Sequence, residues 1–141
     1  MSKSTLFEIT LPLRVRTGKT EASKSFILNL NNYRGCHHMV LSHAKNNYHS
    51  VVEEALDLVG WPENTLTGPF TAVWTLYPPT KTRMDLENPL PIISKFTMDA
   101  LVTFKIIPDD DYKVIRRVIY DIGEVDKINP RATLRLESFH K

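Results

Sequence analysis

The order of strand and helix signals along the chain is the feature that most limits its fold. A run of β-branched and aromatic residues, Phe70–Tyr77, ends at two prolines and therefore predicts a buried strand. Helical spacing of apolar residues predicts one helix over residues 43–59 and another over residues 90–103. Because strands and helices do not strictly alternate, we expect an α+β fold with a mixed β-sheet and two main helices packed on it, in the order β-β-α-β-α-β-β. The other strands are expected at residues 6–13, 37–41, 113–120 and 133–139.

Length and composition fit one soluble domain. A chain of 141 residues buries about two-thirds of its unfolded surface, which is enough to build a core. The single cysteine, Cys36, excludes an intramolecular disulfide and a cysteine-rich zinc site. No apolar run approaches the ~20 residues of a membrane helix, and the N-terminus lacks the apolar core of a signal peptide. We therefore expect one domain over residues 1–141, in the cytoplasm and without a membrane partner. Trp61 and Trp74 are both expected in its core.

Basic side chains gather in the first part of the chain, although the formal net charge is only +2. Residues 1–52 carry seven lysines and arginines against two glutamates. Several of these lie in residues 14–35, which we expect to form a long exposed loop with a short strand at residues 26–28. A basic surface of this kind can neutralise DNA phosphates. A solvated surface without a ligand explains the same charges, and the charges alone do not decide between the two.

Acidic side chains are concentrated further along the chain. Six of the 16 acidic residues fall within residues 85–111. Asp85 and Glu87 precede the second expected helix, Asp99 lies inside it, and Asp109–Asp111 follow it. If the flanking strands bring the two outer groups together, their repulsion calls for a cation, and Mg²⁺ prefers such oxygen ligands. The competing interpretation is that Asp85, Glu87 and Asn88 cap the helix and that the later aspartates form a solvated turn.

The order of these residues resembles the RusA family of Holliday junction resolvases. The family pattern is Asp-x-Asp-Asn after a strand, then a helix with a lysine followed by Asp-Ala-Leu, then a pair of aspartates. This chain has Asp85-Leu-Glu87-Asn88, Lys95, Asp99-Ala-Leu101 and Asp110-Asp111 in the same order. The first strand, with its Leu-Pro ending, is also similar to that of the family. The likeness is strong over residues 83–117 and weak over residues 14–60.

This resemblance implies a RusA-like fold and a Mg²⁺-dependent endonuclease, in which Mn²⁺ is expected to substitute. It implies that Asp85, Glu87 and Asp110 or Asp111 bind the metal and that Lys95 matches an essential lysine. Counting back from Val114 favours Asp111 and counting forward from Asp99 favours Asp110, and we take Asp111 as catalytic together with Asp85, Glu87 and Lys95. Two metal ions about 3.5–4 Å apart would activate water and stabilise the leaving oxygen.

Family members are homodimers that bind four-way DNA junctions and nick two opposed strands symmetrically. Many come from bacteriophages, and a phage-encoded member would work in the host cytoplasm. The basic side chains expected to contact DNA are Arg14, Arg16, Lys19, Lys24, Arg34, Arg83, Arg116 and Arg117.

The chain departs from the family pattern just before Lys95. Glu87 stands where the family usually has aspartate, and the extra methylene moves the carboxylate outward by about 1.5 Å. About four residues are inserted near residues 89–92, and they would displace Lys95 by roughly 5–6 Å if they add one helical turn. Alternatively, Pro89 and Pro91 hold an extended bulge and the helix starts later, with Lys95 in its first turn, which is the arrangement we expect.

These departures keep two other functions open. One is a junction-binding or replication-accessory protein that has the same fold and has lost catalysis. The other is a phosphatase or nucleotide hydrolase that uses the same carboxylates.

Overall fold

A four-stranded mixed sheet organises the chain. The computed structural model describes residues 5–19, 24–81 and 85–140. The sheet has the order β1-β6-β4-β5, with β1 at Thr5–Leu11, β6 at Arg131–Ser138, β4 at Phe70–Tyr77 and β5 at Ile115–Ile122. Strand β6 pairs antiparallel with both β1 and β4, whereas β4 and β5 are parallel. The expected mixed sheet is confirmed, and β1 and β5 form its edges.

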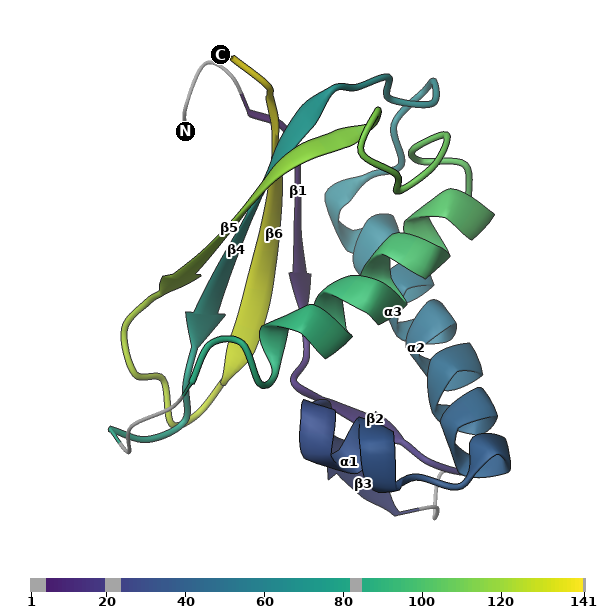
Figure 1. The fold of residues 1–141 in the computed structure, drawn as a ribbon, viewed down its shortest axis with the longest axis vertical. Coiled ribbons are helices and arrows are strands. Elements are labelled where there is room, and N and C mark those ends of the chain that lie inside the picture. Colours follow the sequence, from purple (N-terminus) through teal and green to yellow (C-terminus); the bar gives the residue numbers. More distant parts are fainter. Residues whose placement is uncertain (1–4, 20–23, 82–84, 141) are drawn as a thin grey trace.

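Two helices, α2 (His38–Val59) and α3 (Leu90–Thr103), pack on one face of this sheet (Figure 1). Alternate strand residues point toward them, and on β4 the side chain of Trp74 is completely buried. Tyr48 of α2 and Phe96 of α3 meet edge to face, with ring centroids 6.0 Å apart. Burial of apolar surface stabilises by about 25 cal/mol per Å², so this layer between sheet and helices is the main source of stability. The expected α+β fold is therefore confirmed.

A small hairpin and a short helix occupy the segment that the sequence predicts to be a long loop. Strand β2 (Arg14–Arg16) pairs antiparallel with β3 (Ser25–Ile27), and α1 (Leu30–Gly35) follows. The side chain of Asn29 caps α1 by accepting a hydrogen bond from the N–H of Asn32 at 2.8 Å. The prediction of a long loop is therefore wrong, although the expected short strand near residues 26–28 is present as β3.

Side chains of α2 fasten this hairpin to the rest of the domain. Asn47 donates two hydrogen bonds, to the carbonyls of Arg16 (2.9 Å) and Gly18 (2.8 Å). The buried hydroxyl of Tyr48 donates to the carbonyl of Pro12 at 2.9 Å. The carbonyl of Pro12 lies just before β2, and those of Arg16 and Gly18 lie at and after its end, so the three bonds tie both ends of β2 to α2.

Three other sequence expectations are wrong. Residues 37–41 do not form a strand, because α2 begins at His38 and the ring of His37 caps it by accepting from the N–H of Met39. Trp61 is 42% exposed and donates to Asp57, whereas Trp74 is buried as expected. The expected late start of the second helix is also wrong, because α3 begins at Leu90.

Helix α3 begins at Leu90, as the apolar spacing predicts. Pro91 lies in its first turn, where its missing N–H leaves no hydrogen bond unmade. The prolines therefore do not hold an extended bulge, and Lys95 lies in the second turn of α3 and not in the first. Within the described ranges, no helix has the length and apolar character that crossing a membrane requires.

Candidate functional site

The first acidic group, Asp85 and Glu87, lies in the turn between β4 and α3. Asp85 Oδ1 accepts a hydrogen bond from the N–H of Glu87 at 3.0 Å, and the Asp85 carbonyl accepts one from Asn88 at 3.1 Å. The N–H of Leu30 donates to both oxygens of Asn88, at 3.0 Å to the side chain and 3.1 Å to the backbone. The turn is therefore fixed against α1, while both carboxylates stay exposed. The capping interpretation is wrong, because the N-cap of α3 is Pro89, no side chain caps the helix, and the bond of Asp85 closes a turn ahead of it. The exposure leaves both carboxylates accessible to a cation.

The second acidic group, Asp109–Asp111, lies in the loop between α3 and β5. Asp109 accepts from the N–H of Asp110 at 2.7 Å, and Asp111 accepts from the N–H of Lys113 at 2.9 Å. Such local bonds are typical of aspartates in turns. Partial burial raises the pKa of Asp110, and its hydrogen bond with Asp109 and the negative charges of Asp99 and Asp109 raise it further. Burial is the largest of these causes, and the crowding of carboxylates, which a nearby cation would relieve, adds to it.

The two acidic groups lie at opposite ends of α3. Because β4 and β5 are parallel neighbours, the turn that leaves β4 and the loop that enters β5 are at opposite ends of the sheet (Figure 1). The 14 residues of α3 span about 21 Å between them at 1.5 Å per residue. Among the residues that the structure describes, no three His, Cys, Asp or Glu side chains are grouped so that they could hold a metal ion. The convergence of the two groups does not occur within one chain.

Lys95 and Asp99 lie one turn apart on α3 and have different surroundings. Asp99 forms a salt bridge with Lys45 of α2 at 2.9 Å, so it joins the two helices. Lys95 is exposed and forms no salt bridge with any described residue. Lys95 is about 7.5 Å along the helix from Leu90, which places it nearer to the first acidic group than to the second.

The surroundings of this salt bridge were not predicted from the sequence. His49 of α2 lies beside it, and burial lowers the pKa of His49, against the raising effect of Asp99 and with the lowering effect of Lys45. The Nε2 atom of His49 is buried without a partner in the described structure. The four-residue step between Lys45 and His49 was the only available signal, because it puts both side chains on one face of a helix.

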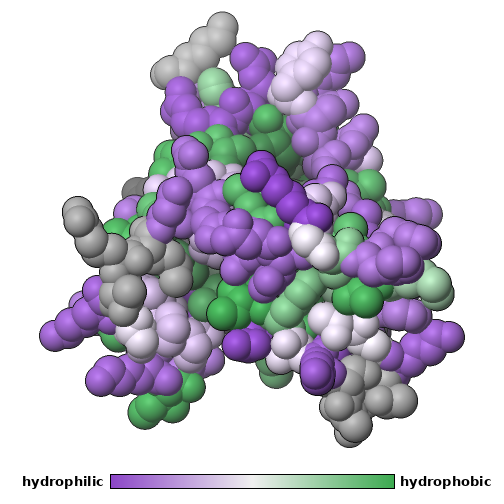
Figure 2. Space-filling view, turned by 60° about the horizontal axis from the view of Figure 1, so that its bottom comes forward, coloured by the Kyte–Doolittle hydropathy of each residue, from purple (hydrophilic) through white to green (hydrophobic). Residues whose placement is uncertain are grey.

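Helix α1 joins the basic hairpin to the turn of the first acidic group, because it follows β3 and its first residue, Leu30, bonds to Asn88. Arg14 donates to Ser25 at 3.4 Å. Figure 2 brings the lower end of Figure 1 forward and shows a mostly hydrophilic surface with smaller hydrophobic areas. Arg83 lies outside the described residues. The other basic residues expected in this region are all at least partly exposed: Arg14, Arg16, Lys19, Lys24 and Arg34.

Arg116 and Arg117 lie at the start of β5, next to the second acidic group. Both are exposed, and both guanidinium groups lie over the ring of Phe139, at 5.3 and 5.1 Å from its centroid. Stacking on the ring restricts the two side chains without using their hydrogen-bond donors. They therefore remain able to bind phosphate oxygens.

Strand β5 is an edge of the sheet and is poorly covered. Val118 and Ile122 point to the face on which the helices pack, as their β4 partners do, yet they are 48% and 53% exposed. Ile119, on the opposite face, is 41% exposed. Backbone groups on the outer side of an edge strand lack a partner strand, and apolar side chains on both faces favour association with another chain. The exposed surface of β5 was not predicted, because the residue pattern of a strand does not indicate which strand becomes the edge of the sheet.

Comparisons with known proteins add no relative. A scan against models of protein families finds none that matches the chain, and a search of curated proteins finds no match. The likeness to RusA resolvases therefore rests on the motif residues alone.

Proposed function

We propose that the chain is a Mg²⁺-dependent endonuclease that resolves four-way DNA junctions by paired symmetric nicks, as its likeness to the RusA family implies. We also propose that it acts as a homodimer in which each metal site takes carboxylates from both subunits. One observation carries this proposal. Strands β4 and β5 form a parallel pair with an exposed acidic group at each end, and the outer strand, β5, is an uncovered edge of the sheet. Such an enzyme would work in the cytoplasm, or in that of the host if a phage encodes it.

The position of each acidic group along β5 follows from its neighbours. Burial raises the pKa of Tyr120, and the negative charge of Glu87 raises it further, so Glu87 lies near this part of β5. The loop of Asp109–Asp111 leads directly into Ile115, the first residue of the strand. The first acidic group therefore belongs to the end of β5 at Ile122, and the second belongs to the end at Ile115.

A two-fold axis through the middle of β5 would bring the two groups together. The axis reverses the strand of the second copy, so the Ile122 end of one β5 lies beside the Ile115 end of the other. Each end of the strand pair then carries one acidic group from each subunit. The same contact would cover Val118 and Ile119, whose exposure is otherwise costly.

The available ligands fit a hard divalent cation. Asp85, Glu87 and Asp110 or Asp111 offer carboxylate oxygens, which Mg²⁺ prefers and Mn²⁺ also accepts. When bound, Mg²⁺ would supply the Lewis acid that activates water for attack on a phosphodiester. Lys95 is exposed and unpaired among the described residues, so its ammonium group is free to neutralise charge on the scissile phosphate.

The two-fold arrangement also fits the substrate. Two sites related by a dyad can reach two opposed strands of a four-way junction at the same time. Arg116 and Arg117 lie beside one acidic group, and the basic hairpin is joined through α1 to the turn of the other. Both would bind phosphates around each site. This electrostatic contribution should weaken steeply as salt concentration rises.

The test is cleavage of a strand-labelled four-way junction in the presence of Mg²⁺. We expect nicks in two opposed strands, no cleavage with a chelator, and loss of cleavage in Asp85→Asn. Glu53→Gln is the matched control, because it also removes one negative charge from an exposed side chain and lies on α2, outside both acidic groups. A junction that stays intact across a range of pH with Mg²⁺ and with Mn²⁺ would reject the nuclease.

A junction-binding protein without catalysis is the second candidate. It is favoured by the position of Lys95 in the second turn of α3 and by Glu87 in place of aspartate. It predicts that the protein shifts junctions in a gel without cutting them and that Asp85→Asn leaves this binding unchanged.

A further inference from the structure

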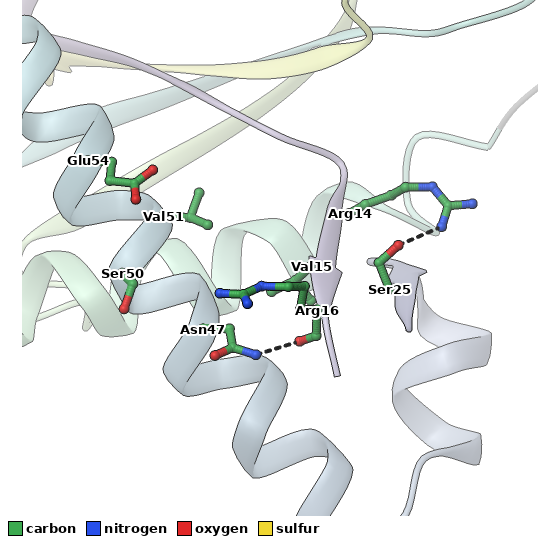
Figure 3. A pocket seen from close by; sticks show the side chains of 8 residues that line it. All are labelled: Arg14, Val15, Arg16, Ser25, Asn47, Ser50, Val51 and Glu54. Carbon is green, nitrogen blue, oxygen red and sulfur yellow. Dashed lines mark hydrogen bonds between the residues drawn. The ribbon is translucent and has the colours of Figure 1, made fainter. Parts of the chain in front are cut away.

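A cavity of about 450 Å³ opens between β2 and α2 (Figure 3). Its size lies within the usual range of small-molecule sites, about 300–1,000 Å³. Arg14 and Arg16 come from β2, and Asn47, Ser50 and Glu54 come from α2. The cavity therefore lies at the base of the basic hairpin, and its walls combine positive, negative and neutral polar groups.

The opposite charges in this cavity do not pair with each other. Arg16 and Glu54 line the same space from opposite walls, and no salt bridge joins them in the described structure. Asn47 is fixed, because its amide nitrogen donates to the carbonyls of Arg16 and Gly18. Its side-chain oxygen is left as an acceptor. A ligand that accepts at one edge and donates at the next would join the two walls.

We propose that this cavity binds one unpaired guanine of a branched DNA, an inference that rests on the proposed function. Guanine offers the acceptors O6 and N7, which match the forked donors of Arg16. Its N1–H and exocyclic amine are donors, which match the carboxylate of Glu54. In a duplex, these donors pair with cytosine, so only a base that has left its pair can present both edges. Branch points supply such bases, and Arg14 at the rim can bind the adjoining phosphate.

The test measures binding without cleavage, in a buffer that contains a chelator. The probes are two fluorescent duplexes that differ at one extrahelical nucleotide, which is guanine in one and an abasic site in the other. We expect the wild-type protein to bind the guanine duplex about tenfold more tightly, the scale of one well-matched base contact. Adenine, cytosine or thymine at the same position should lose most of this preference.

Glu54→Gln separates base recognition from general electrostatics. Removing a negative charge strengthens binding to any DNA backbone. If Glu54 accepts from guanine, this variant instead loses affinity for the guanine duplex, and the preference over the abasic duplex falls below about twofold. Glu53→Gln makes the same charge change on an exposed neighbour that does not line the cavity, and it should keep the tenfold preference.

Three results would overturn the inference. They are equal affinity of the wild-type protein for the guanine and abasic duplexes, equal affinity for all four bases, and tighter binding of both duplexes by Glu54→Gln. Junction cleavage by the same preparation shows whether the proposed nuclease stands when the cavity does not bind guanine. A protein that binds neither the bulged duplexes nor a four-way junction would reject both proposals.

Discussion

Two inactive variants should restore each other's activity if each metal site is shared between subunits. The first variant carries Asp85→Asn and Glu87→Gln, and the second carries Asp110→Asn and Asp111→Asn. Each variant alone forms dimers in which both sites lack ligands. A mixed dimer has one site in which both acidic groups are altered and one site in which both are intact, because the two groups of a site come from different chains.

The size of the recovery follows from the two-fold symmetry. At equal concentrations and with free exchange, half of all dimers are mixed, and each mixed dimer has one intact site of two. The mixture should therefore nick junctions at about a quarter of the wild-type rate per site. It should also produce single nicks and few paired ones, because no mixed dimer contains two intact sites.

The substitutions are chosen to preserve the local structure. Asp85 Oδ1 accepts from Glu87 N–H, and Asp111 Oδ1 accepts from Lys113 N–H. An asparagine keeps an oxygen that can accept the same bond, while it loses the charge that binds a metal. Replacing Asp110 and Asp111 together also removes the ambiguity about which of the two is the main ligand.

The assay is the initial rate of junction nicking on a denaturing gel after co-refolding of the two variants with different tags. Pull-down through one tag and detection of the other establishes that mixed dimers form. Each variant mixed with itself is the control for residual activity. Mixed dimers that form and stay inactive would refute the shared site.

Three further predictions concern the dimer edge, the core and the acidic loop. Ile119→Lys places two positive charges close to the two-fold axis. The variant should therefore be a monomer by light scattering and lose cleavage, while its circular dichroism spectrum stays native. A dimeric, active variant would contradict the proposed interface. Tyr48→Phe removes the 2.9 Å bond to the carbonyl of Pro12 and should lower the free energy of unfolding in urea by about 1–3 kcal/mol, whereas Tyr112→Phe on the surface should change it by less than about 0.5 kcal/mol. Equal effects of these two changes would show that the buried bond adds no stability. Because the pKa of Asp110 is raised, its protonated carboxyl favours the folded state at low pH. This contribution to the free energy of unfolding is lost as pH rises through the folded-state pKa. Without metal, Asp110→Asn should therefore be more stable than the wild type at pH 7, and the difference should vanish at about pH 3. A difference independent of pH would contradict the cost assigned to the charged Asp110 carboxylate in its partly buried, acidic surroundings.

Elements with strong local signals could be predicted from the sequence. Strand β4 ends where two prolines follow it, and the apolar spacing places the start of α3 at Leu90. The interpretation of Pro89 and Pro91 as a bulge moved that start too late, because a proline also fits the first turn of a helix. The first turns of α2 were missed because His38–Leu41 is a short apolar run, and such a run does not distinguish strand from helix. The cap from His37 that starts this helix is not among the common capping residues.

The candidate site was predictable in its residues and not in its arrangement. Motif order selects Asp85, Glu87, Asp110 and Asp111, and all of them are exposed as ligands must be. Their separation follows from topology, because a helix that connects two neighbouring strands makes them parallel and places its two connections at opposite ends. The exposed side chains of β5 had no sequence signal, since covered and uncovered strands share the same apolar pattern.

The most direct measurement is a crystal structure of the protein soaked in Mn²⁺, with the ions located by anomalous scattering. The account predicts a two-fold dimer joined along β5, with manganese between Asp85 and Glu87 of one subunit and Asp109–Asp111 of its partner. Crystals in which the two carboxylate groups remain about 20 Å apart in every assembly, with no manganese on either, would contradict it.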